Sequence, residues 1–169
     1  MIKLLLAVAC ILFSNHSFSQ ISLVDDLQRK MILASPANRI VSLAPSITES
    51  LFAIGADNQI VGVTDYCNYP PKAKTKQRVG GVINPNIETI VSLKPDLIVL
   101  SMEGNVRNDF DKLTSFGVPV FVTNPRNLQG IYKSIAQLGE LSGRKQRAAA
   151  LAGSMKLRVD SLRRNVGTP

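Results

Sequence analysis

The feature that most constrains this chain is an alternation, from Arg39 onward, between short apolar runs and longer stretches with helical spacing. The short runs are rich in β-branched residues and lack the apolar–polar alternation of a half-exposed strand, so they predict strands buried on both faces. These predicted strands are Ile40–Leu43, Ile60–Val63, Leu97–Leu100 and Val118–Val122. Strands that alternate with helices form a mostly parallel sheet with right-handed crossovers. The sequence therefore predicts an α/β fold, a Rossmann-like parallel sheet flanked by helices.

Local signals mark where the helices of this alternation begin and end. Ser46–Glu49 has the pattern of a capping box after Pro45, and Gly55 suits the left-handed residue that closes a helix. A second helix is predicted to begin near Asn86 and to stop before Pro95, which cannot continue a helix. Two further helices are predicted over Val106–Phe116 and Leu128–Leu141.

The segments outside this alternation predict a hairpin at the start and a long helix at the end. Ile21–Val24 and Met31–Leu33 flank a polar stretch, which predicts a short hairpin packed on an edge of the sheet. Arg144–Asn165 predicts one helix of about 33 Å. Its apolar stripe consists of Ala148, Leu151, Ala152, Met155, Val159 and Leu162. Because this helix is longer than a small lobe needs, we expect part of it to project beyond the lobe or to lie beside another segment.

Residues 1–19 have the pattern of a signal peptide: a positive start, an apolar stretch over Leu4–Phe13 and a small-x-small cleavage site at Ser17–Ser19. A membrane-spanning helix is the competing interpretation, but this apolar stretch is too short to cross about 30 Å of hydrocarbon. Lipid attachment at Cys10 is not favoured either, because very few residues precede it. We therefore expect an exported chain that begins near Gln20 and is not a lipoprotein.

Composition excludes several kinds of chemistry once the signal peptide is removed. His16 and Cys10 are lost with it, so the remaining chain has no histidine and only one cysteine, Cys67. A Ser-His-Asp triad, a Cys-His pair and a histidine-based zinc site each need an imidazole. We accordingly predict no catalytic residue, no metal site and no resident cofactor. The formal net charge of +8 comes from bases spread over two segments without interleaved aromatics, so nucleic acid is not a predicted partner.

The loops that follow the predicted strands are where a ligand would bind, because ligands of open α/β sheets lie at the carboxyl ends of the strands. The backbone at Gly80 and Gly81 adds a segment that a ligand could approach closely. A dinucleotide fingerprint and a Walker lysine motif are both missing from the sequence, which argues against nucleotide binding. The loops concerned are Ala44–Ser46, Asp65–Tyr69, Ser101–Asn105 and Asn124–Arg126.

Several motifs occur in an order and spacing that carry a family resemblance: residues 39–49 (RIVSLAPSITE), 61–63 (VGV), 66–71 (YCNYPP), 79–81 (VGG), 84–88 (NPNIE) and 93–97 (LKPDL). With them, the chain from about Val24 to its end resembles the cobalamin and iron-siderophore class of periplasmic solute-binding proteins, which serve ABC importers. The resemblance implies two α/β lobes bridged by one long helix, a ligand held between the lobes, no catalysis, and a monomeric full-length protein.

On this resemblance the chain divides into a signal peptide (1–19), an N-terminal solute-binding lobe (20–143) and an inter-lobe helix (144–169) that ends before a C-terminal lobe. The predicted location is the periplasm. The implied partners are a corrinoid or metal-chelate ligand and the permease of the ABC transporter.

Two residues carry roles over from the resemblance, and each has a plainer alternative. Tyr66 matches an aromatic residue that lies against the ligand's face in cobalamin binders, or it packs on Pro70 and Pro71 within its own loop. Glu88 matches an exposed acidic residue that pairs with arginines of the permease. A glutamate at the start of a helix is also favoured by the helix dipole.

The chain departs from the resemblance where the cobalamin binders place tryptophans, because Val82 and Ser101 align there. The aromatic stacking surface is therefore smaller than in those binders, whereas residues 66–70 favour a corrinoid over a ferric siderophore or haem. The residues predicted to bind the ligand are Pro45, Ser46, Tyr66, Gly81, Val82 and Ser101.

Two rival functions stay open at this stage. One is a small exported Rossmann-like enzyme with Asp65, Glu88 and Glu103 as acid–base candidates, although these carboxylates lie on separate loops. The other is an interaction module that binds no solute. We interpret Cys67 as a small loop residue. The remaining polar candidates have surface or capping roles as their plain interpretation; they are Asp96, Glu103 and Arg126.

Overall fold

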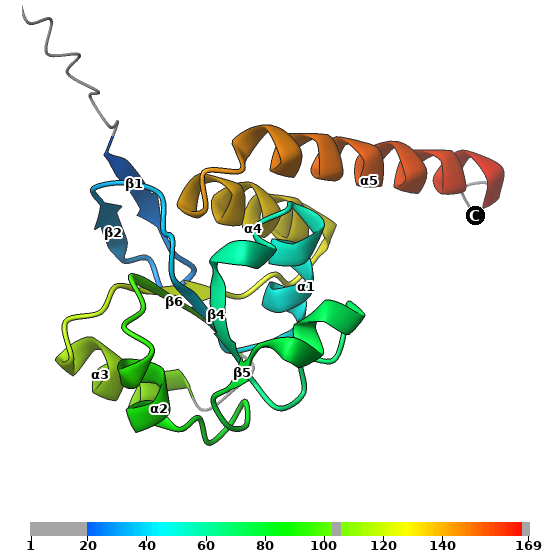
Figure 1. Cartoon of the computed structure of the whole chain (residues 1–169). Helices are drawn as coiled ribbons and strands as arrows, with labels where there is room; N and C mark the ends of the chain where they lie inside the picture. Colours follow the sequence, from blue (N-terminus) through cyan, green and yellow to red (C-terminus); the bar gives the residue numbers. More distant parts are fainter. Residues whose placement is uncertain (1–19, 103–105, 167–169) are drawn as a thin grey trace, which may run out of the picture.

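The structure, a computed structural model, describes residues 20–102 and 106–166 (Figure 1). The predicted signal peptide and Glu103 lie outside the described residues. Within the described ranges, every helix is too short or too polar to cross a membrane.

Five strands form one parallel sheet in the order β5-β4-β3-β6-β7. Their bounds are Ile40–Ser42 (β3), Ile60–Val63 (β4), Gln77–Arg78 (β5), Leu97–Ser101 (β6) and Val120–Thr123 (β7). The four strands predicted from the apolar runs are confirmed, with ends displaced by one or two residues. The chain leaves β3 toward β4 and later returns to the other side of β3 to form β6. This reversal is the topological switch of a doubly wound sheet, so the predicted Rossmann-like fold is confirmed.

Both faces of the sheet are buried, as the unbroken apolar runs predicted. Ile40 and Val99 belong to one hydrophobic core, whereas Val41 and Ile98 belong to the other. Adjacent residues of a strand point to opposite faces, which explains how one short run supplies both cores. The first core is covered by α1 (Pro45–Ala53) and α4 (Leu128–Leu141), and the second by α2 (Ile87–Ser92) and α3 (Val106–Ser115).

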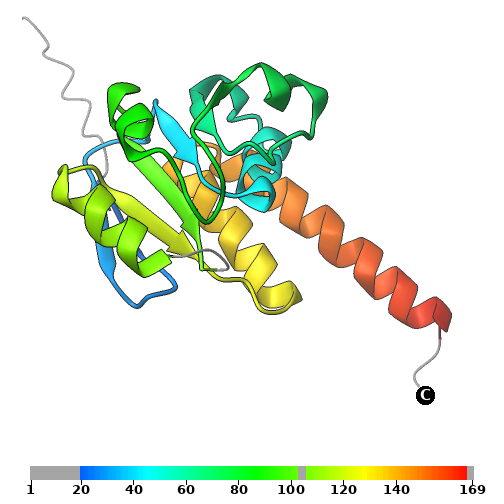
Figure 2. The ribbon, with the colours of Figure 1, turned by 90° about the horizontal axis from the view of Figure 1, so that it is seen from below.

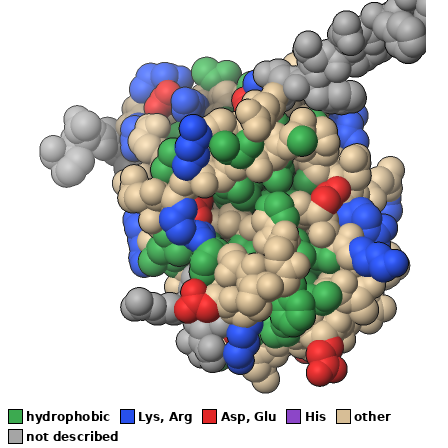
Figure 3. All heavy atoms as spheres, turned by 90° about the vertical axis from the view of Figure 1, so that its left-hand side faces the viewer, with side chains coloured by type: hydrophobic (Ala, Val, Ile, Leu, Met, Phe, Trp, Pro, Cys, Tyr) green, Lys and Arg blue, Asp and Glu red, His purple; other side chains and the backbone are tan. Residues whose placement is uncertain are grey.

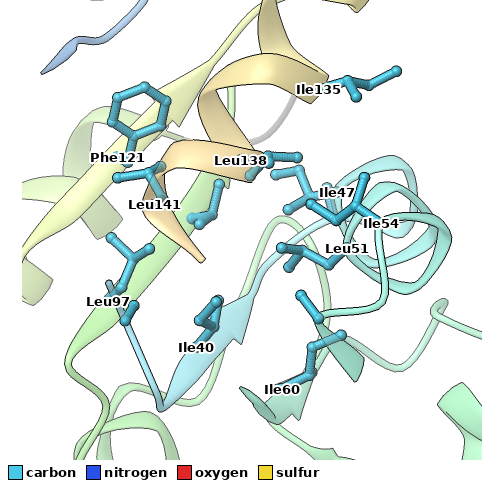
Figure 4. Close-up of a cluster of buried hydrophobic side chains, with 14 of the residues drawn as sticks. Ile40, Ile47, Leu51, Ile54, Ile60, Leu97, Phe121, Ile135, Leu138 and Leu141 are labelled. Carbon is cyan, nitrogen blue, oxygen red and sulfur yellow. The ribbon is translucent and has the colours of Figure 1, made fainter. Parts of the chain in front are cut away.

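The first core joins α1 and α4 to the sheet (Figure 4). Leu51 of α1, Leu138 of α4 and Phe121 of β7 are fully or almost fully buried in it. Burying a side chain of this size contributes about 1.5–3 kcal/mol, so these contacts fix where the amino end of α1 lies relative to the strand ends.

The helix limits follow local sequence signals, with one correction. Gly55 has a φ of 73°, which confirms the predicted left-handed cap, and α2 begins after Asn86, whose side chain accepts a hydrogen bond from the amide of Thr89, which confirms the predicted helix start. The capping box at Ser46 is wrong, because α1 already begins at Pro45, with Ala44 as its N-cap and no side-chain cap bond. Proline has the φ of a first helical residue, which moves the start of the helix one position toward the N-terminus.

One strand was missed by the sequence analysis. β5 contains only two residues, Gln77 and Arg78, and pairs in parallel with Gly62 and Val63 of β4. It carries no apolar run, so its strand geometry comes from the neighbouring strand and not from its own side chains.

The hairpin of β1 (Ile21–Val24) and β2 (Lys30–Leu33) is antiparallel, as predicted. Its turn is fastened to edge strand β7, because the amide of Asp26 donates to the Val122 carbonyl at 3.0 Å. The Asp26 carboxylate in turn accepts from the Asn124 amide at 2.5 Å and from Lys133 at 2.7 Å. The hairpin therefore covers this edge of the sheet, which confirms the predicted packing.

Helix α5 (Lys145–Val166) lies beside α4 in its first part and then runs past the rest of the lobe (Figures 1 and 2). Ala148 is buried in the first core, and Leu151 and Met155 pack against it. Farther along, Leu157 and Leu162 are 71% and 63% exposed. The predicted projection of this helix is confirmed.

Candidate functional site

A hollow of about 340 Å³ lies at the carboxyl ends of β6 and β7, beside the amino end of α1. This is the position at which ligands bind in doubly wound sheets, next to the reversal of strand order. Other hollows of the described structure lie away from the strand ends, for example one of about 170 Å³ between α4 and α5. The hollow at the strand ends is lined by Ser46, Ile47, Glu49, Ser50, Ser101, Thr123, Pro125, Ile131, Ser134 and Ile135.

Hydroxyl groups dominate the polar part of this hollow. Ser46 and Ser50 come from the first turns of α1, Ser101 and Thr123 from the ends of β6 and β7, and Ser134 from α4. Hydroxyls both donate and accept hydrogen bonds without carrying charge. The first-turn amides of α1 add donors, because a helix start leaves its first amides without partners in the helix.

Charge is sparse in the hollow. Among the described residues that line it, Glu49 carries the only formal charge, and its side chain is exposed. Ile131 and Ile135 of α4 supply an apolar wall on the other side. The arrangement suits a solute with neutral hydrogen-bonding groups and apolar surface, and disfavours an anionic group placed next to Glu49.

Tyr66 lies on a tight turn after β4. The turn is closed by a hydrogen bond of 3.1 Å from the Cys67 amide to the Thr64 carbonyl. The Tyr66 side chain is 65% exposed. A ring exposed to this extent is accessible from solvent.

Gly81 lies next to Tyr66, so two of the predicted ligand-binding residues are brought together. A Cβ at Gly81 would lie 3.9 Å from Cε2 of Tyr66. It would also come within 2.3 Å of Oδ1 of Asn84, so the side chain of Asn84 occupies the space that a larger residue would need. Glycine at position 81 therefore leaves room for the side chain of Asn84.

Cys67 is buried at the base of the same turn. Its Sγ lies 3.1 Å from Oγ1 of Thr48 and 3.2 Å from Oγ1 of Thr64. The Thr48 hydroxyl also contacts Ser42, so a buried chain of polar groups connects the turn to α1 and β3. This agrees with the interpretation of Cys67 as a small structural residue.

The predicted ligand residues form two groups and not one. Ser46 and Ser101 line the hollow, and half-buried Pro45 begins the helix that borders it. Tyr66 and Gly81 form the second group, with Val82 half-buried beside Gly81. Sequence analysis missed several lining residues. They are Glu49, Ser50, Thr123 and Ser134. Helical spacing from Ser46 was the signal available for Glu49 and Ser50, and the end of a predicted strand for Thr123, whereas Ser134 on α4 carried no such signal.

Glu88 lies apart from the hollow lining. It is exposed in the first turn of α2, two residues after the cap residue Asn86. Arg126, on the loop after β7, is exposed as well and is not part of the lining. The Asp96 carboxylate accepts hydrogen bonds from the backbone amides of Asn38 and Arg39, just before β3.

Ionisable groups with shifted pKa values lie outside the hollow. A hydrogen bond from Lys72 lowers the pKa of Asp57, and burial lowers the pKa of Lys76. Burial also raises the pKa of Asp109 in α3. In the part of the chain that the structure describes, histidine, cysteine and carboxylate side chains form no group that could hold a metal ion.

Lysine and arginine side chains are scattered around the margin of the face that Figure 3 shows, with hydrophobic side chains between them. Several basic residues form ion pairs with carboxylates of the same chain, such as Lys72 with Asp57 and Lys133 with Asp26. The net positive charge therefore lies on a solvated surface.

The fold is a doubly wound parallel sheet with a hollow at its strand ends and a long projecting helix, and comparison with known proteins identifies its family. The family described as periplasmic binding protein matches residues 40–168, and the chain belongs to this family. The vitamin B12-binding protein of Yersinia pestis (strain Pestoides F) is 34% identical over 130 residues, which are 77% of this chain and 46% of that protein. The family is periplasmic, in line with the predicted export.

Solved structures show the same relationship. The periplasmic vitamin B12 binding protein of Vibrio cholerae matches with a TM-score of 0.72 and 35% identity, over 77% of this chain and 51% of that one. A periplasmic heme binding protein of Pseudomonas aeruginosa matches with a TM-score of 0.70 and 25% identity, over 74% of this chain and 45% of that one. The chain thus spans about half the length of the relatives it matches.

Proposed function

We propose that this chain is the N-terminal lobe of a periplasmic binding protein that captures a corrinoid such as cobalamin and delivers it to the permease of an ABC importer. The lobe performs no chemistry on its ligand. Affinity comes from burying the ligand's apolar surface and from a few polar anchors, as is usual for large solutes.

The hollow beside α1 is the observation that carries this proposal. Five hydroxyl-bearing residues line it together with a single carboxylate, and Tyr66 is exposed on the loop after β4. Corrinoids carry neutral amide groups around the ring, which hydroxyls and helix amides bind well. The relatives with 34% and 35% identity are named for vitamin B12, which supports the same solute.

Haem is the second candidate, because a heme binding protein has the same fold at 25% identity. Haem carries two carboxylates, and these would meet Glu49 and not a basic side chain in the described lining. Like charges across an interface are unfavourable, so this half of the site favours the corrinoid. The enzyme alternative gains no support, because Asp65 and Glu88 are exposed and do not line the hollow with Glu49.

Glu88 is the proposed contact to the permease, and α5 the proposed link toward a second lobe. Glu88 is exposed and lies outside the hollow, so a bound solute and a bound permease would not compete for it. The exposed Leu157 and Leu162 give the far part of α5 an apolar surface that a second lobe would cover.

A substitution in the hollow tests the choice of solute. Glu49→Gln keeps the size of the side chain and removes its charge, so cyanocobalamin binding should change less than twofold while haemin binding becomes several-fold tighter. Glu140→Gln on α4, whose carboxylate pairs with Lys145 away from the hollow, is the matched control. If the parent chain binds haemin more tightly than cyanocobalamin, the corrinoid assignment is wrong.

A further inference from the structure

Arg78 binds both ends of the turn that presents Tyr66. Its Nη1 donates to the Thr64 carbonyl at 2.6 Å and to the Cys67 carbonyl at 3.0 Å. These two carbonyls enclose Asp65 and Tyr66 in the sequence, so one guanidinium nitrogen joins the two ends of the turn.

The position of Arg78 is itself fixed by the sheet. Arg78 is the last residue of β5, where it pairs with Val63, the residue immediately before the turn. The amide of Asp65 donates to the Gly80 carbonyl at 2.9 Å, which adds a bond from the same strand's extension. Strand β5 has only two residues. Besides pairing with β4, its last residue, Arg78, connects the sheet to the turn through its side chain.

An arginine suits this position for a physical reason. Its guanidinium stays charged at any ordinary pH and presents several donors in a rigid plane. Hydrogen bonds from a charged donor are stronger than neutral ones, and the partly buried setting of Arg78 limits competition from water. The turn is therefore held firmly at its base while the ring of Tyr66 remains exposed.

We propose that Arg78 is a positioning residue for solute binding, which holds the Tyr66 turn in its binding conformation before the solute arrives. A preorganised aromatic contact binds more tightly because less conformational entropy is lost on binding. The proposal rests on the proposed function, since it assumes that the ring of Tyr66 contacts the corrinoid.

A double-mutant cycle with cyanocobalamin as the probe tests this inference. Tyr66→Ala, Arg78→Met and the double variant are compared in the purified chain, with affinity measured by difference absorbance. Arg78→Met should weaken binding about threefold to tenfold, and no more than Tyr66→Ala does. In the Tyr66→Ala background, the same change should cost less than about twofold, because two residues that act as one unit are not additive.

Two further variants separate positioning from loss of charge or of fold. Lys74→Met removes one positive charge from the preceding segment and should leave affinity at the parent level. Arg78→Lys keeps a charged donor without the rigid guanidinium plane and should recover only part of the affinity. Hydrogen exchange of Arg78→Met should be faster in residues 64–69 and unchanged in β3 and β6.

The possible failures are distinguishable from one another. If the parent chain does not bind cyanocobalamin, the proposed function fails and this inference fails with it. If Tyr66→Ala weakens binding but Arg78→Met does not, or if the two effects add fully, Arg78 does not act through Tyr66. Faster exchange throughout Arg78→Met would show a general structural role and overturn the inference.

Discussion

Asp96 and Arg39 are hydrogen-bonded to each other in both directions. The Asp96 carboxylate accepts from the Arg39 amide at 2.9 Å, and the Asp96 amide donates to the Arg39 carbonyl at 3.0 Å. The same carboxylate accepts from the Asn38 amide at 2.8 Å. Because these residues precede β3 and β6, the bonds align the two strands whose far ends flank the hollow.

Replacing Asp96 by alanine should therefore destabilise the lobe. Two bonds from backbone amides to a charged acceptor are lost at an exposed position, which predicts a loss of about 1–2 kcal/mol in the free energy of unfolding. For a domain of this size, the melting temperature should fall by about 3–8 °C. Asp96→Asn keeps one acceptor oxygen and should lose about half as much. Unchanged melting of Asp96→Ala would show that the strand pairing alone sets this alignment.

Tyr66→Ala should weaken cyanocobalamin binding while leaving the fold intact. An aromatic contact contributes on the order of 1 kcal/mol beyond area burial, so affinity should fall about tenfold. The ring is 65% exposed, and its loss should shift the melting temperature little. Titration and thermal melting of the same sample measure both quantities. A large loss of stability with unchanged affinity would favour packing within the loop as the role of Tyr66.

In the full-length protein, Glu88→Arg should reduce solute uptake by cells and leave solute affinity within about twofold of the parent. Charges at the margin of an interface mainly set encounter rate and register, and a reversed charge would oppose a basic permease surface. Asp111→Arg on α3 is a matched charge reversal on the same lobe and should leave uptake unchanged. An equal loss of uptake and affinity in Glu88→Arg would place Glu88 in the ligand site.

The far part of α5 should make the chain prone to self-association. Leu157 and Leu162 are largely exposed, and exposed apolar surface promotes association. Light scattering should show an apparent mass that rises with concentration, and Leu157→Gln with Leu162→Gln should reduce that rise. The vitamin B12 binding protein of Vibrio cholerae, of which this chain spans about half, should stay monomeric under the same conditions. If the chain stays monomeric at all concentrations, the exposed Leu157 and Leu162 do not cause self-association.

Much of the fold could be predicted because its signals are local. The apolar runs of β4 and β6 determine their burial without reference to the rest of the chain, and Asn86 caps α2 through a bond three residues away. The limits of α4 match the prediction at both ends for the same reason.

The parts that escaped prediction depend on residues far apart in the sequence. β5 is a strand only because β4 lies beside it, and the bonds of Arg78 exist only once both strands are in place. Thr123 and Ser134 join the hollow through the packing of β7 and α4. The predicted capping box is wrong for a local reason: Pro45 is the first residue of α1, so Ala44 and not Ser46 is the N-cap.

Equilibrium dialysis of the purified chain against cyanocobalamin, haemin and a ferric siderophore tests the central claim most directly. The account predicts that the chain retains cyanocobalamin in preference to the other two, with an affinity well below that of the vitamin B12 binding protein of Vibrio cholerae, of which it spans about half. Affinity for a large solute grows with the surface that encloses it. The solute should be recovered chemically unchanged. Retention of haemin or the siderophore without cyanocobalamin, or recovery of an altered corrinoid, would contradict it.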